Sequence, residues 1–303
     1  MDSTVYRAYG KINLSLDVTG VREDGYHLVR MIMQTVDVYD VLSFTRIPAD
    51  EVRVTVAPGS AERGAMSLPT GDGNLVCRAI DAMRGAFGIR EGICVMLTKN
   101  IPMAAGMAGG SVDAAAAFRA MNELFDLGVS DAQLAELALP LGADIPYCLT
   151  GGTQLAEGIG GDLTALCAMP ECGIVLLKPA EGVSTGAVYR ALDAAPIENH
   201  PDIGGMLDAI RRTDLKGVCE YCGNVLERVT AGMLPVIGEM KEALCAQGAM
   251  TACMTGSGPT VFGIFADRCR AEEAAKALAG TGLCADGRLI ATAPADTALK
   301  KIG

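Results

Sequence analysis

The 303-residue sequence has few cationic residues, only two histidines and no long apolar segment. Lysine and arginine total 25 against 36 aspartates and glutamates, which gives a formal net charge of −11. Nucleic acids and anionic membranes bind cationic faces, so we expect neither as a main partner. No apolar run reaches the roughly 20 residues that a membrane-spanning helix needs, and the first ten residues do not follow a signal-peptide pattern. We therefore expect a cytoplasmic protein.

The cysteines do not form a metal-binding pattern. There are eleven, an odd number, and they are scattered along the chain. Cys219 and Cys222 form a single C-x-x-C pair without a second pair or a suitably spaced histidine, so we expect no zinc site. Reduced thiols in an intracellular protein fit this usage better.

The apolar half of the composition is ample for a buried core in a chain of this length. Helix and strand patterns occur together in both halves, which predicts an α+β fold. Asn74 is expected to cap a helix over residues 75–87, and Ser130 opens a capping box. Near residues 152–163 the sequence becomes glycine-rich without periodicity. We place the domain boundary there, with domains at 1–157 and 158–303.

A glycine- and alanine-rich stretch lies between a predicted strand at residues 93–97 and a predicted helix that starts at Ser111. The first N–H groups of a helix have no intrahelical partner and carry partial positive charge. Small residues such as Gly106, Gly109 and Gly110 leave these donors accessible, so the stretch predicts a cradle for a nucleoside triphosphate. Ser111 adds a hydroxyl suited to a phosphate oxygen or a magnesium ion. A tight turn before a closely packed helix explains the glycines equally well.

Two common nucleotide-binding patterns are absent from this stretch. No lysine precedes Ser111, as a P-loop would require. The glycines also do not follow a strand as G-x-G-x-x-G, which argues against a dinucleotide fold.

Polar residues elsewhere are candidates to complete such a site. Lys11 and Asn13 share one face of a strand predicted over residues 8–18. Asp144 stands among apolar residues, and pairing with Lys11 would leave it ionised but poorly hydrated. The alternatives are a solvated strand face for Lys11 and a helix or turn cap for Asp144.

Further candidates lie in two turns and a helix. Tyr26 and His27 form either a platform for a flat ligand or a plug in a loop. Thr185 and Tyr189 are one turn apart on a predicted helix and share its face. A second loop of small residues, 255–260, either braces the first one or makes a hairpin turn.

Three of these segments, in this order, resemble the GHMP kinase superfamily, named for galactokinase, homoserine kinase, mevalonate kinase and phosphomevalonate kinase. They are residues 10–14 (GKINL), 102–115 (PMAAGMAGGSVDAA) and 255–259 (TGSGP). Residues 24–27 (DGYH) and 142–148 (GADIPYC) are similar to one branch of it, which acts in the non-mevalonate isoprenoid (MEP) pathway. The similarity covers nearly the whole chain.

The resemblance implies a ribosomal-protein-S5-like N-terminal domain and a ferredoxin-like C-terminal domain. It implies transfer of the ATP γ-phosphoryl group to the 2-hydroxyl of a cytidine diphosphate-linked methylerythritol. Mg²⁺ would come with the nucleotide, so no resident metal site is expected. The protein would be a monomer or a homodimer.

By this similarity Lys11 and Asp144 hold the catalytic positions. Tyr26 and Tyr189 match rings that sandwich the cytosine, His27 matches the residue that reads the cytosine edge, and Asn13 and Thr185 match positions near the alcohol. The ATP-binding loop comprises Pro102, Met103, Ala104, Ala105, Gly106, Met107, Ala108, Gly109, Gly110, Ser111 and Val112.

The loop departs from the usual superfamily pattern at three positions. Ala104 and Ala108 replace common glycines, and an alanine forced to positive φ costs on the order of 1 kcal/mol. Val112 replaces a serine and so removes one hydroxyl. These changes bear on ATP affinity more than on reaction type.

Two other functions compete with this one. A superfamily kinase for homoserine or mevalonate would have no use for a ring sandwich. A non-catalytic nucleotide-binding protein would fit the altered loop.

Overall fold

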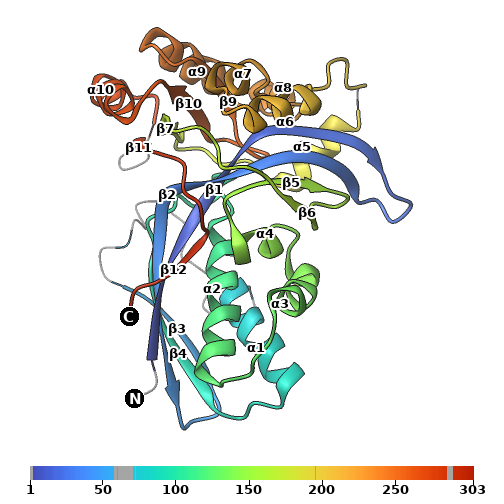
Figure 1. Ribbon diagram of the computed structural model, residues 1–303, viewed down its shortest axis with the longest axis vertical. Coiled ribbons are helices and arrows are strands. Elements are labelled where there is room, and N and C mark those ends of the chain that lie inside the picture. Colours follow the sequence, from blue (N-terminus) through green and yellow to red (C-terminus); the bar gives the residue numbers. More distant parts are fainter. Residues whose placement is uncertain (1–2, 58–59, 61–70, 72, 195, 285–288) are drawn as a thin grey trace.

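The computed structural model describes residues 3–57, 60, 71, 73–194, 196–284 and 289–303. Within these residues the chain forms an eight-stranded and a four-stranded sheet, each packed against helices (Figure 1). The predicted α+β class is confirmed.

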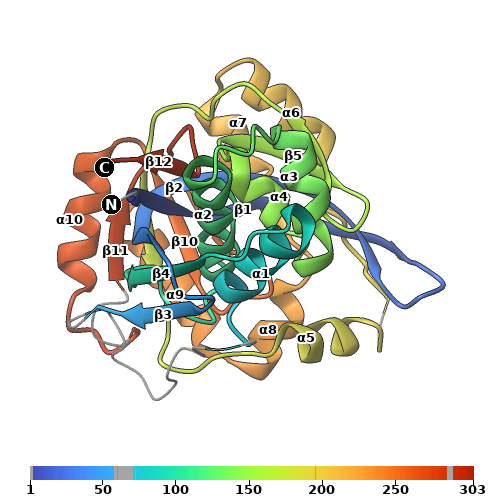
Figure 2. The same cartoon turned by 90° about the horizontal axis from the view of Figure 1, so that it is seen from below.

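Two long antiparallel strands, β1 (Ser3–Val21) and β2 (His27–Ile47), form the backbone of the larger sheet. Their hairpin projects from the body of the molecule (Figure 2). The pairing register shifts between Tyr9 and Lys11 and again between Asn13 and Ser15. Such irregularities redirect side chains, and these two flank the polar pair of β1.

Short strands complete the larger sheet. Its order is β12-β1-β2-β4-β3, with β5 on β2, β6 on β5 and β8 on β1. Their bounds are β3 (Val52–Val56), β4 (Gly92–Thr98), β5 (Thr153–Glu157), β6 (Asp162–Ala165), β8 (Gly223–Asn224) and β12 (Leu299–Lys301). The sheet thus takes strands from both sides of residue 157, and the domain boundary drawn there stays a prediction.

Helix α2 (Gly109–Leu124) packs against β1 and β2 and is buried from Val112 to Phe118, whereas its first turn is partly exposed. Its alanines at 114–117 allow close approach, because they are fully buried without bulk. Around it lie α1 (Leu75–Phe87), α3 (Asp131–Ala138), the 3-10 turn η1 (Leu139–Leu141) and α4 (Ile145–Thr150). The caps expected at Asn74 and Ser130 are confirmed.

The smaller sheet has the antiparallel order β11-β7-β10-β9, the order of ferredoxin-like folds. The strands are β7 (Gly173–Leu177), β9 (Thr251–Met254), β10 (Val261–Phe265) and β11 (Leu289–Thr292). Helices α9 (Val236–Ala246) and α10 (Arg268–Leu278) pack on it, and the remaining helices are α5 (Thr185–Leu192), α6 (Ile203–Arg211), α7 (Leu215–Glu220) and α8 (Glu227–Met233). The ferredoxin-like expectation is confirmed.

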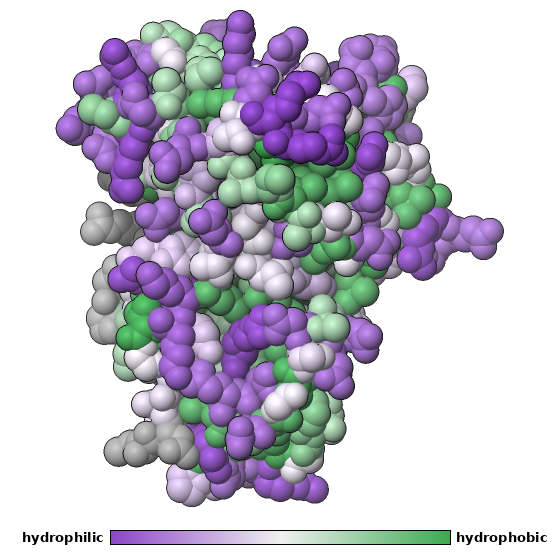
Figure 3. Space-filling model, in the orientation of Figure 1, coloured by the Kyte–Doolittle hydropathy of each residue, from purple (hydrophilic) through white to green (hydrophobic). Residues whose placement is uncertain are grey.

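The face seen in Figure 3 mixes hydrophilic residues with hydrophobic areas. Among the described residues, no helix has both the length and the apolar character needed to cross a bilayer.

Candidate active site

A cavity of about 700 Å³ opens between the β1–β2 hairpin, the start of α2, α4 and α5. Many of its lining residues were singled out in the sequence, although they come from distant segments. These are Lys11, Asn13, Tyr26, His27, Gly106, Ala108, Ser111, Asp144, Thr185 and Tyr189.

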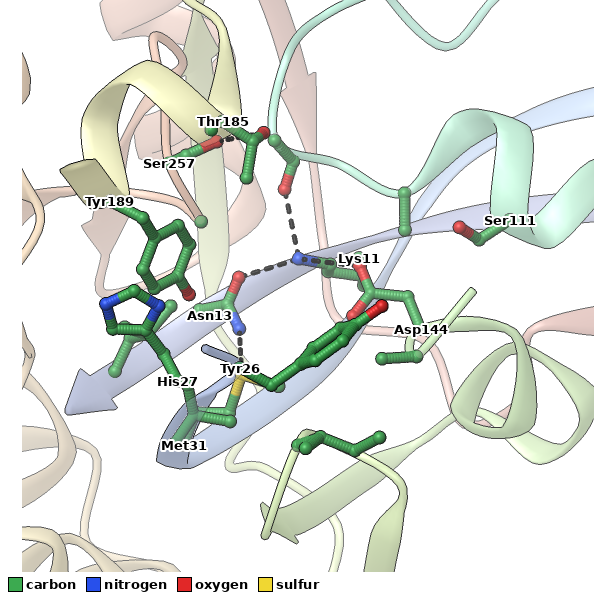
Figure 4. A pocket seen from close by; sticks show the side chains of 18 of the residues that line it. Lys11, Asn13, Tyr26, His27, Met31, Ser111, Asp144, Thr185, Tyr189 and Ser257 are labelled. Carbon is green, nitrogen blue, oxygen red and sulfur yellow. Dashed lines mark hydrogen bonds and ion pairs between the residues drawn. The ribbon is translucent and has the colours of Figure 1, made fainter. Parts of the chain in front are cut away.

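Lys11 points into this cavity from β1 and is only 4 % exposed. Its Nζ donates to Asn13 Oδ1 at 2.7 Å and to the Gly106 carbonyl at 3.1 Å. It also lies 3.6 Å from Asp144 Oδ2, so the expected ion pair is present (Figure 4). The alternative of a solvated strand face is therefore wrong for Lys11.

Asp144 immediately precedes α4, a position typical of a cap. Nevertheless its side chain accepts no capping hydrogen bond from any residue that the structure describes. The carboxylate is about one third exposed (32 %) and faces Lys11. Asp144 is thus free of the structural duty that its position suggested, and it presents an oxygen to the cavity.

The first turn of α2 forms another part of the cavity wall. It begins at Gly109, and no described side chain caps it. The hydrogen bond from Val112 N to Ala108 O is 2.9 Å long, whereas the N–H groups of residues 109–111 precede the first intrahelical acceptor. These donors and the helix dipole make an anion site, and Ser111 lines the cavity beside them.

The three loop departures have different structural consequences. Ala104 and Ala108 do take the left-handed conformation, with φ of 49° and 57°. Val112 is fully buried in the core, so a hydroxyl at that position would point into apolar surroundings. The contact thought lost at Val112 therefore does not belong to the phosphate site.

A second cavity, of about 340 Å³, lies along the same loop. Residues 102–110 all line it, together with Asn74, Leu75 and Lys99. Gly106 and Ala108 border both cavities, so the two cavities lie next to each other at this part of the loop.

The loop at 255–260 packs directly against the phosphate loop, as expected of a brace. A Cβ on Gly106, whose φ is +70°, would lie 2.4 Å from the Thr255 carbonyl oxygen. The Thr255 hydroxyl accepts the Asn13 backbone N–H at 2.9 Å. Only glycine fits at position 106, and the contact ties the last third of the chain to β1.

In Figure 4, His27 and Tyr189 lie together on the side of the cavity away from Ser111, whereas the Tyr26 ring is drawn beside Asp144. The rings of His27 and Tyr189 lie 4.6 Å apart with a 43° tilt. Tyr26 is 63 % exposed, so it is not a buried plug. Burial, with the charge of Asp144 adding to it, raises the pKa of Tyr189 to about 12, so its ring stays neutral.

Three further lining residues were not named as site candidates from the sequence, although Ser257 belongs to the 255–260 loop noted there. Asp193 Oδ1 lies 2.7 Å from His27 Nε2, and the Ser257 hydroxyl lies 2.8 Å from that of Thr185. Arg190 adds a cation at the rim. Helical spacing held a signal for Asp193, because it follows Tyr189 by four residues, as Tyr189 follows Thr185.

Comparison with known proteins agrees with this arrangement. Residues 74–152 match the family model described as GHMP kinases N terminal domain, and residues 206–282 match GHMP kinases C terminal. A 4-diphosphocytidyl-2-C-methyl-D-erythritol kinase from Lachnospira eligens is 50 % identical over 267 residues, which is 88 % of this chain and 90 % of the relative. The enzyme of the same name from Caldicellulosiruptor bescii is 43 % identical over 272 residues, 90 % of this chain and 93 % of its own.

The chain belongs to the 4-diphosphocytidyl-2-C-methyl-D-erythritol kinase family of GHMP kinases.

Solved structures place this GHMP kinase in the same fold. A crystal structure of 4-(cytidine 5'-diphospho)-2C-methyl-D-erythritol kinase has a TM-score of 0.78 and 30 % identity, covering 96 % of this chain and 98 % of its own. A homoserine kinase from Cytophaga hutchinsonii has a TM-score of 0.75 at 19 % identity, covering 100 % and 98 %. The latter likeness shows the shared fold alone.

Proposed function

We propose that the protein transfers the γ-phosphoryl group of ATP to the 2-hydroxyl of 4-(cytidine 5'-diphospho)-2-C-methyl-D-erythritol. The observation that carries this proposal is the Lys11–Asp144 ion pair, which shares one cavity with an uncapped helix start and a cluster of rings. Its setting would be the isoprenoid (MEP) pathway that the resemblance of the sequence motifs implies, and we keep a cytoplasmic location as a prediction from the sequence.

The acceptor would lie along the larger cavity. The cytosine would stack among Tyr26, Tyr189 and His27 at one end, since flat rings bind bases by their faces. The methylerythritol would reach Asn13 and Thr185, next to Lys11. The cavity volume of about 700 Å³ suits a substrate with a base, a diphosphate and a polyol.

ATP would approach from the other side of the phosphate loop. The second cavity offers room for its nucleoside, and the triphosphate would pass the tip at Gly106 and Ala108. The N–H groups of residues 109–111 would then meet the terminal phosphates. Mg²⁺ bound to the nucleotide would neutralise phosphate charge, and the Ser111 hydroxyl is the side chain best placed to contact it.

The reaction asks the protein mainly for position and positive potential. Asp144 accepts the hydrogen bond of the 2-hydroxyl and takes its proton as the oxygen–phosphorus bond forms. The bond between the γ-phosphorus and its bridging oxygen breaks, and ADP leaves with that electron pair. The Lys11 ammonium lies 3.6 Å from Asp144 and would face the phosphoryl group, while Asn13 and the Gly106 carbonyl fix its position.

A coupled ADP-release assay with the cytidyl substrate tests the proposal. Asp144→Asn removes the proton acceptor and half of the ion pair, and we expect it to lower kcat by at least about a hundredfold. Asp208→Asn, at an exposed aspartate of α6 paired with Arg211, is the matched control and should retain wild-type turnover.

Wild-type protein that binds ATP but releases no ADP with this substrate would contradict the proposal and favour a non-catalytic nucleotide-binding protein. Turnover of homoserine or mevalonate instead would favour another superfamily kinase.

A further inference from the structure

Helix α5 directs a third residue, Asp193, at the proposed base-binding end of the cavity. Thr185, Tyr189 and Asp193 are spaced by four residues and therefore share one helix face. All three line the cavity. Asp193 differs from the other two because its carboxylate forms a hydrogen bond with the ring of His27.

The hydrogen bond between Asp193 and His27 determines which ring nitrogen of the histidine carries a proton. A carboxylate is only an acceptor, so at 2.7 Å from Oδ1 the Nε2 atom must be the donor. In a neutral imidazole the other nitrogen, Nδ1, is then an acceptor. Among the residues that the structure describes, none forms a hydrogen bond with Nδ1 of His27. His27 lines the cavity, and its ring packs against that of Tyr189.

We propose that Asp193 is a positioning residue that fixes His27 as a hydrogen-bond acceptor and thereby makes the pocket prefer cytosine over uracil. The inference rests on the proposed function, because it assumes that a pyrimidine binds beside Tyr189. Cytosine carries an amino group at C4, which donates to an acceptor. Uracil carries an oxygen there, and two facing acceptors leave a buried polar group unpaired.

The chain contains its own control for this contact. Its only other histidine, His200, pairs through Nδ1 with Asp17 Oδ1 at 2.8 Å. Both pairs join the β1–β2 hairpin to the segment that runs from the end of α5 to α6, but only the His27 pair lines the cavity. Loss of either pair removes a contact between the hairpin and this segment. Only loss of the Asp193 pair should also change the hydrogen bond between His27 and the edge of the base.

Binding of CDP and of UDP, measured by calorimetry at pH 8 where histidines are ordinarily neutral, tests the inference. The two ligands share ribose and diphosphate, so the ratio of their Kd values reports on the base. Wild-type protein should prefer CDP by about tenfold or more. Asp193→Asn can accept or donate at Nε2, so it permits both histidine tautomers, and we expect the ratio to fall by about tenfold. Asp17→Asn should leave the ratio at its wild-type value.

An unchanged ratio in Asp193→Asn would overturn the role of Asp193 while leaving the proposed function intact. An equal fall in Asp17→Asn would overturn it too, by showing that tethering alone matters. If wild-type protein bound neither nucleotide, the proposed cytidine substrate would fail and this inference with it.

Discussion

At the scale of single residues, one ammonium and two carboxylates form a buried cluster beside the phosphate loop, so one carboxylate has no cation of its own. Lys99 Nζ contacts Asp40 and lies 2.7 Å from Asp113 Oδ2. Asp113 Oδ1 is buried without a hydrogen-bond partner among the described residues. Burial is the largest effect, and together with the Asp40 charge it raises the pKa of Asp113 to about 8, although Lys99 acts in the opposite direction.

This raised pKa predicts a pH-dependent stability. Between the ordinary aspartate pKa near 4 and the folded value near 8, the folded protein binds more protons than the unfolded chain. The free energy of unfolding therefore falls as pH rises through that window. Asp113→Asn leaves Lys99 and Asp40 as a neutral pair, so we expect the variant to be more stable than wild type by about 1–3 kcal/mol at pH 9, and progressively less so towards pH 5.

Urea unfolding at pH 5, 7 and 9 measures this difference, with Asp208→Asn as the exposed control. Parallel pH profiles for wild type and Asp113→Asn would refute the raised pKa.

The site residues fall into those with a local signal and those without one. Asp144 was identifiable because it is a charged residue among apolar neighbours, and Lys11 because it is the charged residue at the start of a strand whose polar face is short. The buried set of Lys99, Asp40 and Asp113 was not, because Lys99 follows β4 while Asp40 lies on β2 and Asp113 on α2, and only the packed fold brings them together. Asp193 is an intermediate case. It follows Tyr189 by four residues, which places it on the same helix face, but a charged residue at the end of a helix is common and does not by itself indicate a site.

At the scale of elements, the start of α2 combines an exposed helix dipole with a strained backbone. Ala108 precedes the helix in the left-handed region, where an alanine costs on the order of 1 kcal/mol relative to glycine. A glycine within a helix normally lowers the free energy of unfolding by about 0.5–1 kcal/mol relative to alanine, because it loses more backbone entropy on folding. The two effects oppose each other at this position.

We therefore expect Ala108→Gly to leave the free energy of unfolding within about 0.5 kcal/mol of wild type. Ala115→Gly in the same helix is the matched control, because Ala115 is fully buried at an ordinary helical position. That variant should lose about 1 kcal/mol or more through backbone entropy and a small cavity. Chemical denaturation of both variants makes the comparison. Equal losses in the two would show that Ala108 is not strained.

Elements with strong periodicity or caps were predictable, and elements made by distant pairing were not. The capped helices α1 and α3 have the expected starts, since Asn74 and Ser130 act within one turn. Helix α2 begins at Gly109, two residues before the predicted start. The three residues of β12 carry no local signal, because they become a strand only by pairing with β1.

At the scale of the whole molecule, the proposed function requires an acidic protein to bind two polyanionic ligands. With a net charge of −11, the protein as a whole does not attract anions. Local positive groups must attract the ligands instead, and these are the start of α2, Lys11 and Arg190. These groups lie on parts of the chain that meet only because β1 contacts both the phosphate loop and the 255–260 loop. No single local pattern indicates such a meeting of distant segments. The three motifs taken together, in their order along the chain, predicted the fold through their resemblance to a known superfamily.

The two tyrosines show the same dependence on the whole fold. Tyr26 follows the turn of the β1–β2 hairpin and Tyr189 lies on α5, yet both line one cavity. If they enclose a cytosine, loss of either ring removes a stacking face worth about 1–3 kcal/mol. Tyr189→Ala and Tyr26→Ala should then raise KM for the cytidyl substrate roughly tenfold.

The KM for ATP, measured in the same steady-state assay, is the internal control, because the nucleoside of ATP is placed on the other side of the phosphate loop. Tyr221→Ala, at a tyrosine beyond α7 outside the lining of this cavity, is the control variant. A rise in the KM for ATP alone would place the adenine between these rings instead. No change in either constant would mean that neither ring stacks on the cytosine, which would contradict the proposed position of the base.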